Sequence, residues 1–318
     1  MNHVKPRPTL SERAQAYLDY RRSLGYRMDS DGKLVLKFAR WVDELGHRGP
    51  ITTELALRWA TLPTQAAKTY QAHRLTAVRC FARYCALFDP ATEVPSTRLL
   101  GEAYRRCTPF VYSPQQQQTL LTAARQLSPA DGLRPHTYVA LFGLLWCTGL
   151  RISEALNLRR ADIDWQAGIL TVKQTKFHKS RLVPLHPSAV KALRQYTKRR
   201  DRLKPCPQTD HFFLSEDGGV LVYAAVRGTF RKLRKVVPVP TGQRRPRMHD
   251  CRHTFACQRL LAWYRAGVDV NHAITALATY LGHTQVTDTY WYFTATPELL
   301  AVAADRLPPG GLPSRGGR

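Results

Sequence analysis

The chain has 318 residues and a formal charge of +25, from 48 lysines and arginines against 23 acidic residues. A charge of this size bears on partners and solubility rather than on fold, and it favours a polyanion, with nucleic acid ahead of an acidic membrane surface. The seven cysteines include no Cys-x-x-Cys pair, which argues against a disulfide framework or a ribbon-type zinc site and fits a reducing compartment. The N-terminus lacks the apolar core of a signal peptide and no apolar run is long enough to span a bilayer, so we expect a cytoplasmic protein without a membrane segment.

The N-terminal part predicts a flexible tail over 1–10 and then a helical domain over 11–88. Apolar spacing and capping residues place its four helices from Ser11 to Leu24, from Leu34 to Gly46, from Thr52 or Thr53 onward, and from Thr64 to about Leu87.

The fourth of these helices separates an apolar face from a basic one. The expected buried positions are Tyr70, Leu75, Val78, Phe81 and Tyr84. The opposite face carries Lys68, Arg74, Arg79 and Arg83. A basic stripe beside an aromatic core suits a helix that lies on DNA, so these four basic residues are predicted to bind DNA. The alternative is an ordinary solvated face.

A proline-containing break over 89–110 predicts a linker, and a second domain is expected over 111–306. Its helices are expected over 114–126 (capped by Ser113), over 133–147, from R-I-S-E-A-L-N-L onward, and near 187–202, 223–236, 249–266 and 270–282. Three short antiparallel strands are expected in D-I-D-W, G-I-L-T-V-K-Q-T and R-L-V-P-L. The predicted fold class is therefore mainly α with a small antiparallel β-sheet (α+β), ending in a disordered Gly/Pro-rich tail over 307–318.

Two stretches of the second domain place basic residues at turns. In C-T-G-L-R-I-S-E-A-L, Arg151 stands at a helix start near free backbone amides, which suits a phosphate, and Glu154 could hold its guanidinium. A structural Arg–Glu pair is the alternative. In K-Q-T-K-F-H-K-S-R, a lysine in the turn between two strands could reach a DNA groove or a leaving oxygen, although ordinary turn chemistry is the favoured explanation when this cluster is taken alone. The residues of this cluster are Lys173, Lys176, Lys179 and Arg181.

Two further stretches hold histidines and tyrosines. In M-H-D-C-R-H-T-F-A, His249 and Arg252 share one helical face. His253 follows four residues after His249, but no zinc site is expected, because the glutamate of H-E-x-x-H and a third ligand are missing. In Y-L-G-H-T-Q-V-T-D-T-Y-W-Y-F, His283 leaves a helix end after a glycine, and Tyr292 is either a phenolic nucleophile or a buried aromatic.

Together these residues suit phosphodiester chemistry without a metal. Arginines can neutralise the extra charge of a pentavalent phosphorane, and attack by a tyrosine conserves the energy of the phosphodiester. The motifs T-G-L-R-I-S-E-A-L, H-D-C-R-H and L-G-H, with a hairpin lysine between the first two, resemble those of the phage-integrase family of tyrosine recombinases. The nucleophile of that family usually lies nine residues after the last histidine, which selects Tyr292 over its rival Tyr290. More weakly, Y-L-D-Y-R-R-S-L-G-Y resembles the family's helical core-binding domain.

The resemblance implies a site-specific recombinase that cuts and rejoins DNA through a 3′-phosphotyrosyl link and a Holliday junction, with no metal or other cofactor. The second domain is then catalytic, and Tyr292 attacks the scissile phosphate. The other implied roles are Arg151 and Arg252 on the non-bridging oxygens, Lys176 as general acid to the 5′-oxygen, His249 as general base or proton relay, His283 as hydrogen-bond donor to the phosphate, and Glu154 as support for Arg151. Lys173, Lys179 and Arg181 are implied to contact DNA.

The implied partner is double-stranded DNA with inverted-repeat core sites, bound by a dimer per site and a homo-tetramer per reaction, with other recombinases of the same element as further partners. The expected location is the nucleoid. The implied task is integration, excision or transposition of a mobile element, since 280–306 look most like integrases of transposon-like elements. Resolution and inversion stay open, and so do two other functions: a type IB topoisomerase-like enzyme and a catalytically silent DNA-binding accessory protein.

Two departures and the C-terminus leave further choices open. Thr175 and Phe177 replace the glycines that flank the family's hairpin lysine, so Lys173 and Lys179 remain alternatives to Lys176. Cys251 replaces the usual leucine within His-x-x-Arg. The segment T-P-E-L-L-A-V-A-A-D-R-L is expected to form a helix that docks on a neighbouring protomer or, alternatively, on its own domain. Its apolar face would consist of Leu299, Leu300, Val302 and Ala303.

Overall fold

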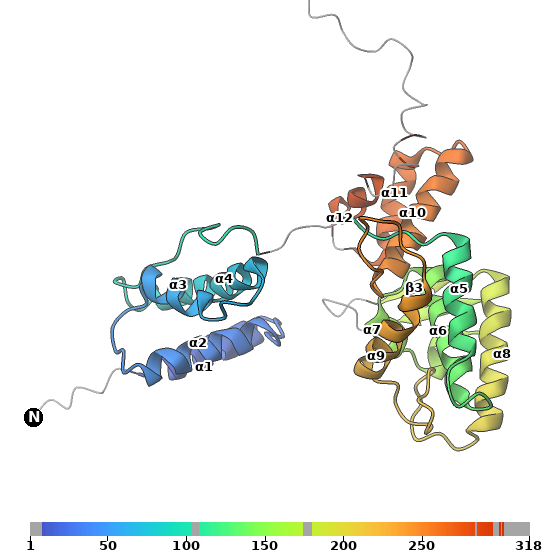
Figure 1. Cartoon of the computed structure of the whole chain (residues 1–318), viewed down its shortest axis with the longest axis horizontal. Helices are drawn as coiled ribbons and strands as arrows, with labels where there is room; N and C mark the ends of the chain where they lie inside the picture. The colour runs from blue at the N-terminus through green and yellow to red at the C-terminus, as the bar shows by residue number, and fades with distance from the viewer. Residues whose placement is uncertain are drawn as a thin grey trace, which may run out of the picture. The chain divides into compact units, whose positions relative to one another are not determined.

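The computed structural model describes residues 8–103, 108–173, 180–283 and 285–294, together with Leu299 and Ala301. Its contacts divide the chain into two compact units, Met1–Cys107 and Thr108–Arg318, each with a buried core of its own (Figure 1). Both are mostly helical, and the larger one contains a small antiparallel sheet. The predicted α+β class is therefore confirmed.

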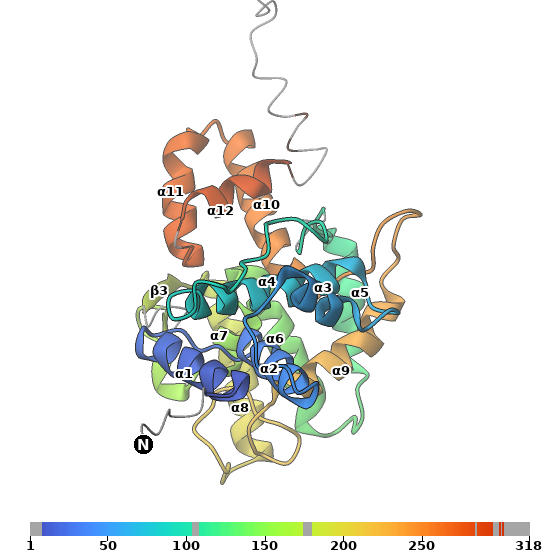
Figure 2. The same cartoon turned by 90° about the vertical axis from the view of Figure 1, so that its left-hand side faces the viewer.

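The smaller unit consists of α1 (Leu10–Ser23), α2 (Asp31–Glu44), α3 (Thr53–Thr61) and α4 (Lys68–Cys85), all visible in Figure 2. Thr9, rather than the expected Ser11, caps α1, because its side chain and that of Glu12 form a reciprocal capping box. The start of α4 is later than expected, since the backbone closes tight turns from Ala66 to Pro63 and from Thr64 to Leu62. The four helices enclose an apolar core that includes an edge-to-face pair of Phe38 and Trp59, with ring centroids 5.4 Å apart.

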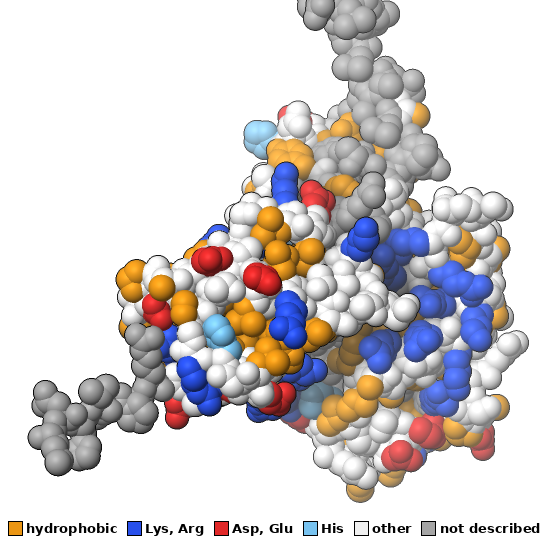
Figure 3. Space-filling model, turned by 60° about the vertical axis from the view of Figure 1, so that its left-hand side comes forward, with side chains coloured by type: hydrophobic (Ala, Val, Ile, Leu, Met, Phe, Trp, Pro, Cys, Tyr) orange, Lys and Arg blue, Asp and Glu red, His pale blue; other side chains and the backbone are white. Residues whose placement is uncertain are grey.

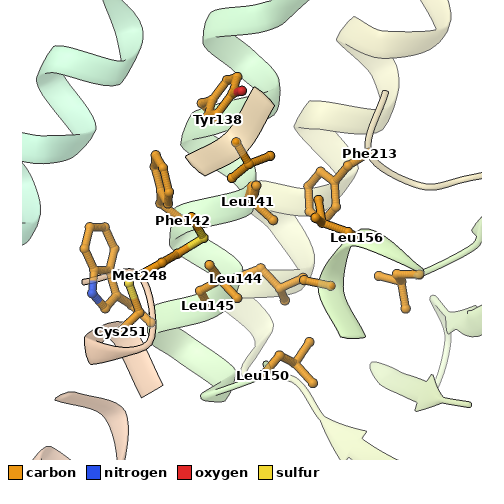
Figure 4. Packing of buried hydrophobic residues seen from close by; sticks show 14 of the residues in the cluster. Tyr138, Leu141, Phe142, Leu144, Leu145, Leu150, Leu156, Phe213, Met248 and Cys251 are labelled. Carbon is orange, nitrogen blue, oxygen red and sulfur yellow. The ribbon is translucent and has the colours of Figure 1, made fainter. Parts of the chain in front are cut away.

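The larger unit is built around one apolar helix, α6 (Leu133–Thr148), which packs against α5 (Pro114–Arg125), α8 (Pro187–Leu203) and α10 (Asp250–Arg265). Figure 4 shows Phe142 of α6 close to Met248, which lies just before α10. As predicted, Ser113 caps α5, and it forms a capping box with Gln116. The remaining helical elements are α7 (Ile152–Leu156), η1 (Arg160–Asp162), α9 (Tyr223–Leu233), η3 (Arg234–Val236), α11 (Val270–Leu281), α12 (Thr287–Tyr290) and η4 (Trp291–Thr294).

The sheet is the predicted antiparallel meander in the order β1-β2-β3, with β1 (Ile163–Asp164), β2 (Ile169–Val172) and β3 (Arg181–Pro184). Leu170 of β2 stands opposite Ile163 on one side and Val183 on the other, and all three are buried. This register turns the alternate side chains of the strands into the core beside α6. The strand β3 also contacts α11, which brings the sheet to the C-terminal helices.

The last helices form a second core in the larger unit. α10, α11 and α12 gather together in both cartoon views (Figures 1 and 2), and η4 contacts α10. Tyr292 of η4 and Leu299 are buried in this cluster with Phe255 and Leu281. The one-turn elements α12 and η4 are not predicted by the sequence, because a single turn is too short to show helical periodicity.

Candidate active site

Arg151 begins α7 directly behind the end of α6. Gly149 closes α6 with a positive φ of 63°, a conformation that glycine adopts readily. At the start of α7, Glu154 accepts hydrogen bonds from the Arg151 backbone N–H and from Nη1, both at 2.9 Å, so the predicted Arg–Glu pair is present. Arg151 Nη2 donates to the carbonyl of Gly282 at 3.2 Å. Its side chain remains 31% exposed, which leaves the guanidinium accessible to a ligand.

Arg181 of β3 is the second partner of Glu154. Its Nη1 lies 3.0 Å from Oε1 and its Nη2 2.7 Å from Oε2, while Nε donates to the Tyr280 carbonyl at 2.8 Å. The arginine side chain is only 11% exposed. The expectation that Arg181 is a DNA contact in a hairpin is therefore wrong, because its guanidinium group already donates hydrogen bonds to the Glu154 carboxylate and to a carbonyl of α11.

The charge state of Glu154 follows from these partners. Burial raises its pKa, but hydrogen bonds and charge from Arg181, and then hydrogen bonds from Arg151, outweigh burial and lower the pKa to about 2. The carboxylate is therefore ionised at neutral pH and can hold both guanidinium groups in place.

Arg252 lies inside the protein, on the first turn of α10, and is 1% exposed. Its Nη1 donates to the Gly149 carbonyl at 2.9 Å and its Nη2 to the Leu281 carbonyl at 2.7 Å. Burial lowers its pKa to about 10, so the side chain is still charged at neutral pH. The carbonyls that end α6 and α11 thus fix this arginine near Arg151, which itself donates to the carbonyl of Gly282.

Tyr292 of η4 is 2% exposed, and its side chain lies near Arg252, His253 and His283. Its ring centroid lies 5.5 Å from that of His253 and 6.1 Å from that of His283, the second pair being nearly parallel. Burial raises the pKa of Tyr292, while the charge of Arg252 and a hydrogen bond from it act in the opposite direction. Tyr290, the rival tyrosine, is 48% exposed.

His283 follows Gly282, which ends α11 with a positive φ of 69°. A hydrogen bond of 2.7 Å joins its Nδ1 to Thr289 Oγ1, so α12 orients the ring. Burial, and next the charge of Arg252, lower the pKa of His283 to about 4, which makes the imidazole neutral at neutral pH.

His249 is the cap residue of α10, one turn before His253, and the two rings are 4.7 Å apart. Although the side chain is exposed to solvent, desolvation by the surrounding protein, with Arg252 acting in the same direction, lowers the pKa of His249 to about 4. Within the described ranges no His, Cys, Asp or Glu cluster could hold a metal ion.

An acidic residue next to His249 anchors the start of α10, and the sequence reasoning missed it. Asp250 is 1% exposed and accepts two hydrogen bonds from the fork of Arg244, at 2.7 and 2.6 Å, as well as one from the Arg247 backbone N–H. An acidic residue in the first turn of a helix is the available signal for such a cap. The pair holds the helix end that carries Arg252.

Of the three hairpin lysines, Lys173 lies within the described residues. Lys173 is 60% exposed, and its Nζ lies 2.6 Å from Oδ1 of the buried Asp162. Lys176 and Lys179 lie outside the described residues. At the C-terminus, Leu299 is 1% exposed within the core of its own chain, whereas Leu300, Val302 and Ala303 also lie outside the described residues.

Of the basic residues predicted on one face of α4, two are not at the surface. Arg74 is 8% exposed, stacks on the Trp59 ring and donates to the Trp59 carbonyl at 2.6 Å. Arg79 is equally buried and donates to the carbonyls of Pro95 and Ser96, both at 2.8 Å. The expectation of a four-residue exposed stripe is therefore wrong, because two of the guanidinium groups cap backbone carbonyls.

The other two basic residues of α4, Lys68 and Arg83, are exposed. Leu75, Val78 and Phe81 are buried as predicted, whereas Tyr70 is 42% exposed and that prediction is wrong. In the larger unit, Figure 3 shows Lys and Arg side chains gathered on one face, an arrangement that suits a polyanion.

The chain is similar in sequence to known proteins of one family. The model of the family described as "Phage integrase family" matches residues 111–298. A Sinorhizobium fredii protein named "Putative integrase/recombinase y4rB" is 41% identical over 305 residues, covering 94% of this chain and 97% of the relative. "Tyrosine recombinase XerC" of Chlamydia trachomatis is 29% identical over 79% of this chain and 75% of its own.

Among solved structures, the Tn1549 transposon integrase in complex with transposon right end DNA has the same fold. The TM-score is 0.67 at 18% sequence identity, over 94% of this chain and 99% of that one. In the part of this chain that the structure describes, none of the helices is both long enough and apolar enough to cross a membrane.

Proposed function

This chain belongs to the phage integrase family and is a DNA recombinase, and from that membership we propose that it cuts and rejoins specific DNA sites through a 3′-phosphotyrosyl intermediate. The observation that supports this mechanism most strongly is the environment of the Tyr292 side chain. Its phenol is buried against Arg252, with the rings of His253 and His283 beside it. A tyrosine that served only to fill a core would not need a charged guanidinium and two polar rings as neighbours.

The two arginines bind the scissile phosphate in this proposal. Arg151 offers an accessible guanidinium, and the five N–H donors of Arg252 exceed the two that the carbonyls of Gly149 and Leu281 accept. Because both groups are fixed before the substrate arrives, they stabilise the developing phosphorane charge without reorganisation. Neutral His283 adds a hydrogen bond from its ring to a non-bridging oxygen.

Tyr292 then attacks the phosphorus, and the bond from phosphorus to the 5′-oxygen breaks. The phenolic proton leaves by way of His249, the proposed base or relay, and Lys176 is the proposed donor of a proton to the 5′-oxygen. Attack by that 5′-hydroxyl, or by one from a partner strand, reverses the step and releases Tyr292. The phosphodiester energy is conserved at each stage, so exchange through a Holliday junction needs no added energy source.

The proposed assembly follows from the family and from the charge. A dimer would bind each pair of inverted core sites and two dimers would form a tetramer, with further recombinases of the same element as partners. Lys68, Arg83, Lys173 and Lys179 are the proposed phosphate contacts outside the active site. The proposed task is integration, excision or transposition of a mobile element, carried out on the nucleoid in the cytoplasm.

The test begins with the DNA site, which covalent complexes can supply. Cells that express the chain would be lysed in denaturant, and the DNA joined to the protein would be recovered and sequenced. A duplex carrying the recovered site and a nick near the cleavage position then serves as a suicide substrate. We expect the wild-type chain to form a covalent adduct that denaturing gels detect.

Tyr292→Phe is the decisive variant, and Tyr290→Phe is its matched control two residues away. The first should form no adduct and the second should form the wild-type amount. An adduct that persists in Tyr292→Phe would assign the nucleophile elsewhere. Site-specific binding without any adduct from the wild type would indicate a silent accessory protein, and relaxation of plasmid DNA without strand exchange would indicate a topoisomerase.

A further inference from the structure

His253 lies within the candidate active site but has no role in the proposed cleavage steps. It lies on α10 one turn after His249, and its ring contacts both the His249 ring, at 4.7 Å, and the Tyr292 ring, at 5.5 Å. Among the described rings, no contact joins His249 to Tyr292 directly. His253 therefore stands between the proposed base and the nucleophile.

The same face of α10 also contacts the backbone of Tyr292. One turn beyond His253, the Cys257 thiol lies 4.0 Å from the Tyr292 carbonyl, so α10 supports the backbone of the tyrosine as well as its ring. The His253 ring meets the phenol at 62°, whereas the His283 ring meets it at 17°. Two imidazoles in different orientations thus define the plane of the phenol.

The Nδ1 atom of His253 indicates that the residue does more than fill space in the core. Its Nδ1 is buried and has no hydrogen-bond partner among the described residues. A buried polar atom without a partner is costly, and such atoms call for a functional explanation. Burial, with a further contribution from His249, lowers the pKa of His253 to about 4, so the ring is neutral at neutral pH and has one nitrogen free to accept a hydrogen bond.

We propose that His253 is a positioning residue for the nucleophile: its ring fixes the plane of Tyr292, and its Nδ1 accepts a hydrogen bond from the phenolic hydroxyl when DNA is bound. This rests on Tyr292 being the nucleophile, as proposed above. The accepted hydrogen bond increases the electron density on the phenolic oxygen and aims its lone pair at the phosphorus. His249 then acts on the tyrosine through His253.

The test compares three substitutions on the nicked suicide duplex at saturating DNA. His253→Phe keeps a ring but no acceptor, His253→Asn keeps a polar atom near the Nδ1 position, and His253→Gln places one near Nε2. We expect His253→Phe to slow adduct formation about 100-fold, the lower end of what help with proton transfer by a positioned side chain typically contributes. His253→Asn, which keeps an acceptor, should stay within about 5-fold of wild type. His253→Gln should be as slow as His253→Phe, and DNA affinity should be unchanged in all three.

A fluorinated tyrosine at position 292 separates this role from general damage to the structure. Its more acidic hydroxyl should restore about 10-fold or more of the rate in His253→Phe and change the wild-type rate by less than about 3-fold, since a more acidic nucleophile depends less on an acceptor. His272→Phe is the matched control, because the His272 side chain is 97% exposed on α11. It should behave as wild type.

A wild-type rate in His253→Phe, equal rates in the Asn and Gln variants, or no rescue by the fluorinated tyrosine would each overturn the proposal while Tyr292 stays the nucleophile. If His253→Phe does not fold, the comparison of Asn with Gln decides. Absence of any Tyr292 adduct in the wild type would instead overturn the proposed function, and this inference with it.

Discussion

Arg181 and Glu154 form a two-pronged ion pair, with Nη1 3.0 Å from Oε1 and Nη2 2.7 Å from Oε2. The same carboxylate holds Arg151, and the same arginine donates through Nε to α11. One buried pair therefore connects the strand β3, the helix that begins at Arg151, and the helix that ends before His283. The position of the proposed phosphate-binding arginine therefore depends on a residue of the strand β3.

The first prediction is that Arg181→Lys damages both stability and chemistry. A lysine keeps the charge but cannot reproduce the bidentate geometry of the guanidinium group. Glu154 therefore loses one of its two hydrogen bonds from residue 181, and the Tyr280 carbonyl of α11 loses its hydrogen bond. We expect the unfolding free energy of the larger unit to fall by about 3 kcal/mol, the range for a buried pair that loses a partner. Adduct formation should slow about 10-fold, because Arg151 is less firmly placed.

Arg160→Lys is the control for that experiment, since Arg160 forms an exposed pair with Asp201. Exposed pairs contribute about 1 kcal/mol or less, so denaturant unfolding should barely change. Equal losses in the two variants would show that the Arg181 fork has no special role.

The second prediction concerns acid stability and Glu154. Its folded pKa of about 2 lies below the ordinary value of 4.5, so the ionised form stabilises the folded state above pH 4.5. That contribution, on the order of 3 kcal/mol, is lost as the pH falls from about 4.5 to 2, because the unfolded chain takes up the proton first. Unfolding curves should show wild type losing its advantage over Glu154→Gln across that window. A constant difference between them would contradict the assignment.

The third prediction concerns the histidines, which affect stability over a higher pH range than Glu154 does. His253 and His283 have folded pKa values of about 4, below the ordinary 6.5, so their neutral forms stabilise the folded state above pH 6.5. The stabilisation decreases as the pH falls from 6.5 towards 4, by about 1 kcal/mol for each residue once solvent screening is allowed for. Melting temperatures between pH 7 and 5 should therefore fall less steeply in His283→Gln than in wild type. Glu154 contributes nothing there, and an unchanged slope would show that His283 is not held neutral.

The fourth prediction separates the basic residues of α4 by their surroundings. Arg74→Ala and Arg79→Ala should destabilise the smaller unit by about 2 kcal/mol each, since both remove charged hydrogen bonds from backbone carbonyls. Lys68→Ala and Arg83→Ala should leave stability unchanged and each reduce the slope of DNA affinity against salt by about 1. Titrations of binding at several salt concentrations, with melting curves, check both halves. A normal salt slope in the Lys68 and Arg83 variants would remove α4 from the DNA interface.

The order and type of the longer elements could be predicted from the sequence, because apolar spacing, caps and glycine stops mark them directly. The motif residues Arg151, Arg252 and His283 could likewise be placed near helix ends, and the structure brings them together. The one-turn elements could not be predicted, since α12 and η4 hold too few residues to show a period. Their existence is what buries Tyr292.

Charged residues were harder to interpret, because a sequence does not show which backbone carbonyls a side chain will meet. Arg74 and Arg79 have the spacing of a surface stripe, yet carbonyls of α3 and of the segment around Pro95 bind them. Arg181 stands among lysines in the sequence, yet it turns inward to Glu154. The spacing of His253 from His249 suggests only a metal ligand, because its contact with Tyr292 depends on the packing of η4 against α10, which no local sequence pattern encodes.

The two glycines that end α6 and α11 have a consequence for how this enzyme can change. Gly149 and Gly282 give their carbonyl oxygens to Arg252 and Arg151, so main-chain atoms that every amino acid possesses hold the arginines. A Cβ at Gly149 would lie 2.6 Å from a ring carbon of Phe255, and one at Gly282 would lie 2.9 Å from Arg181 Nη1. In a library that randomises the chain and is selected for altered DNA sites, we expect replacements over much of the surface and near-invariance at these two glycines. New target specificities can then accumulate on the surface while the cutting machinery is inherited intact.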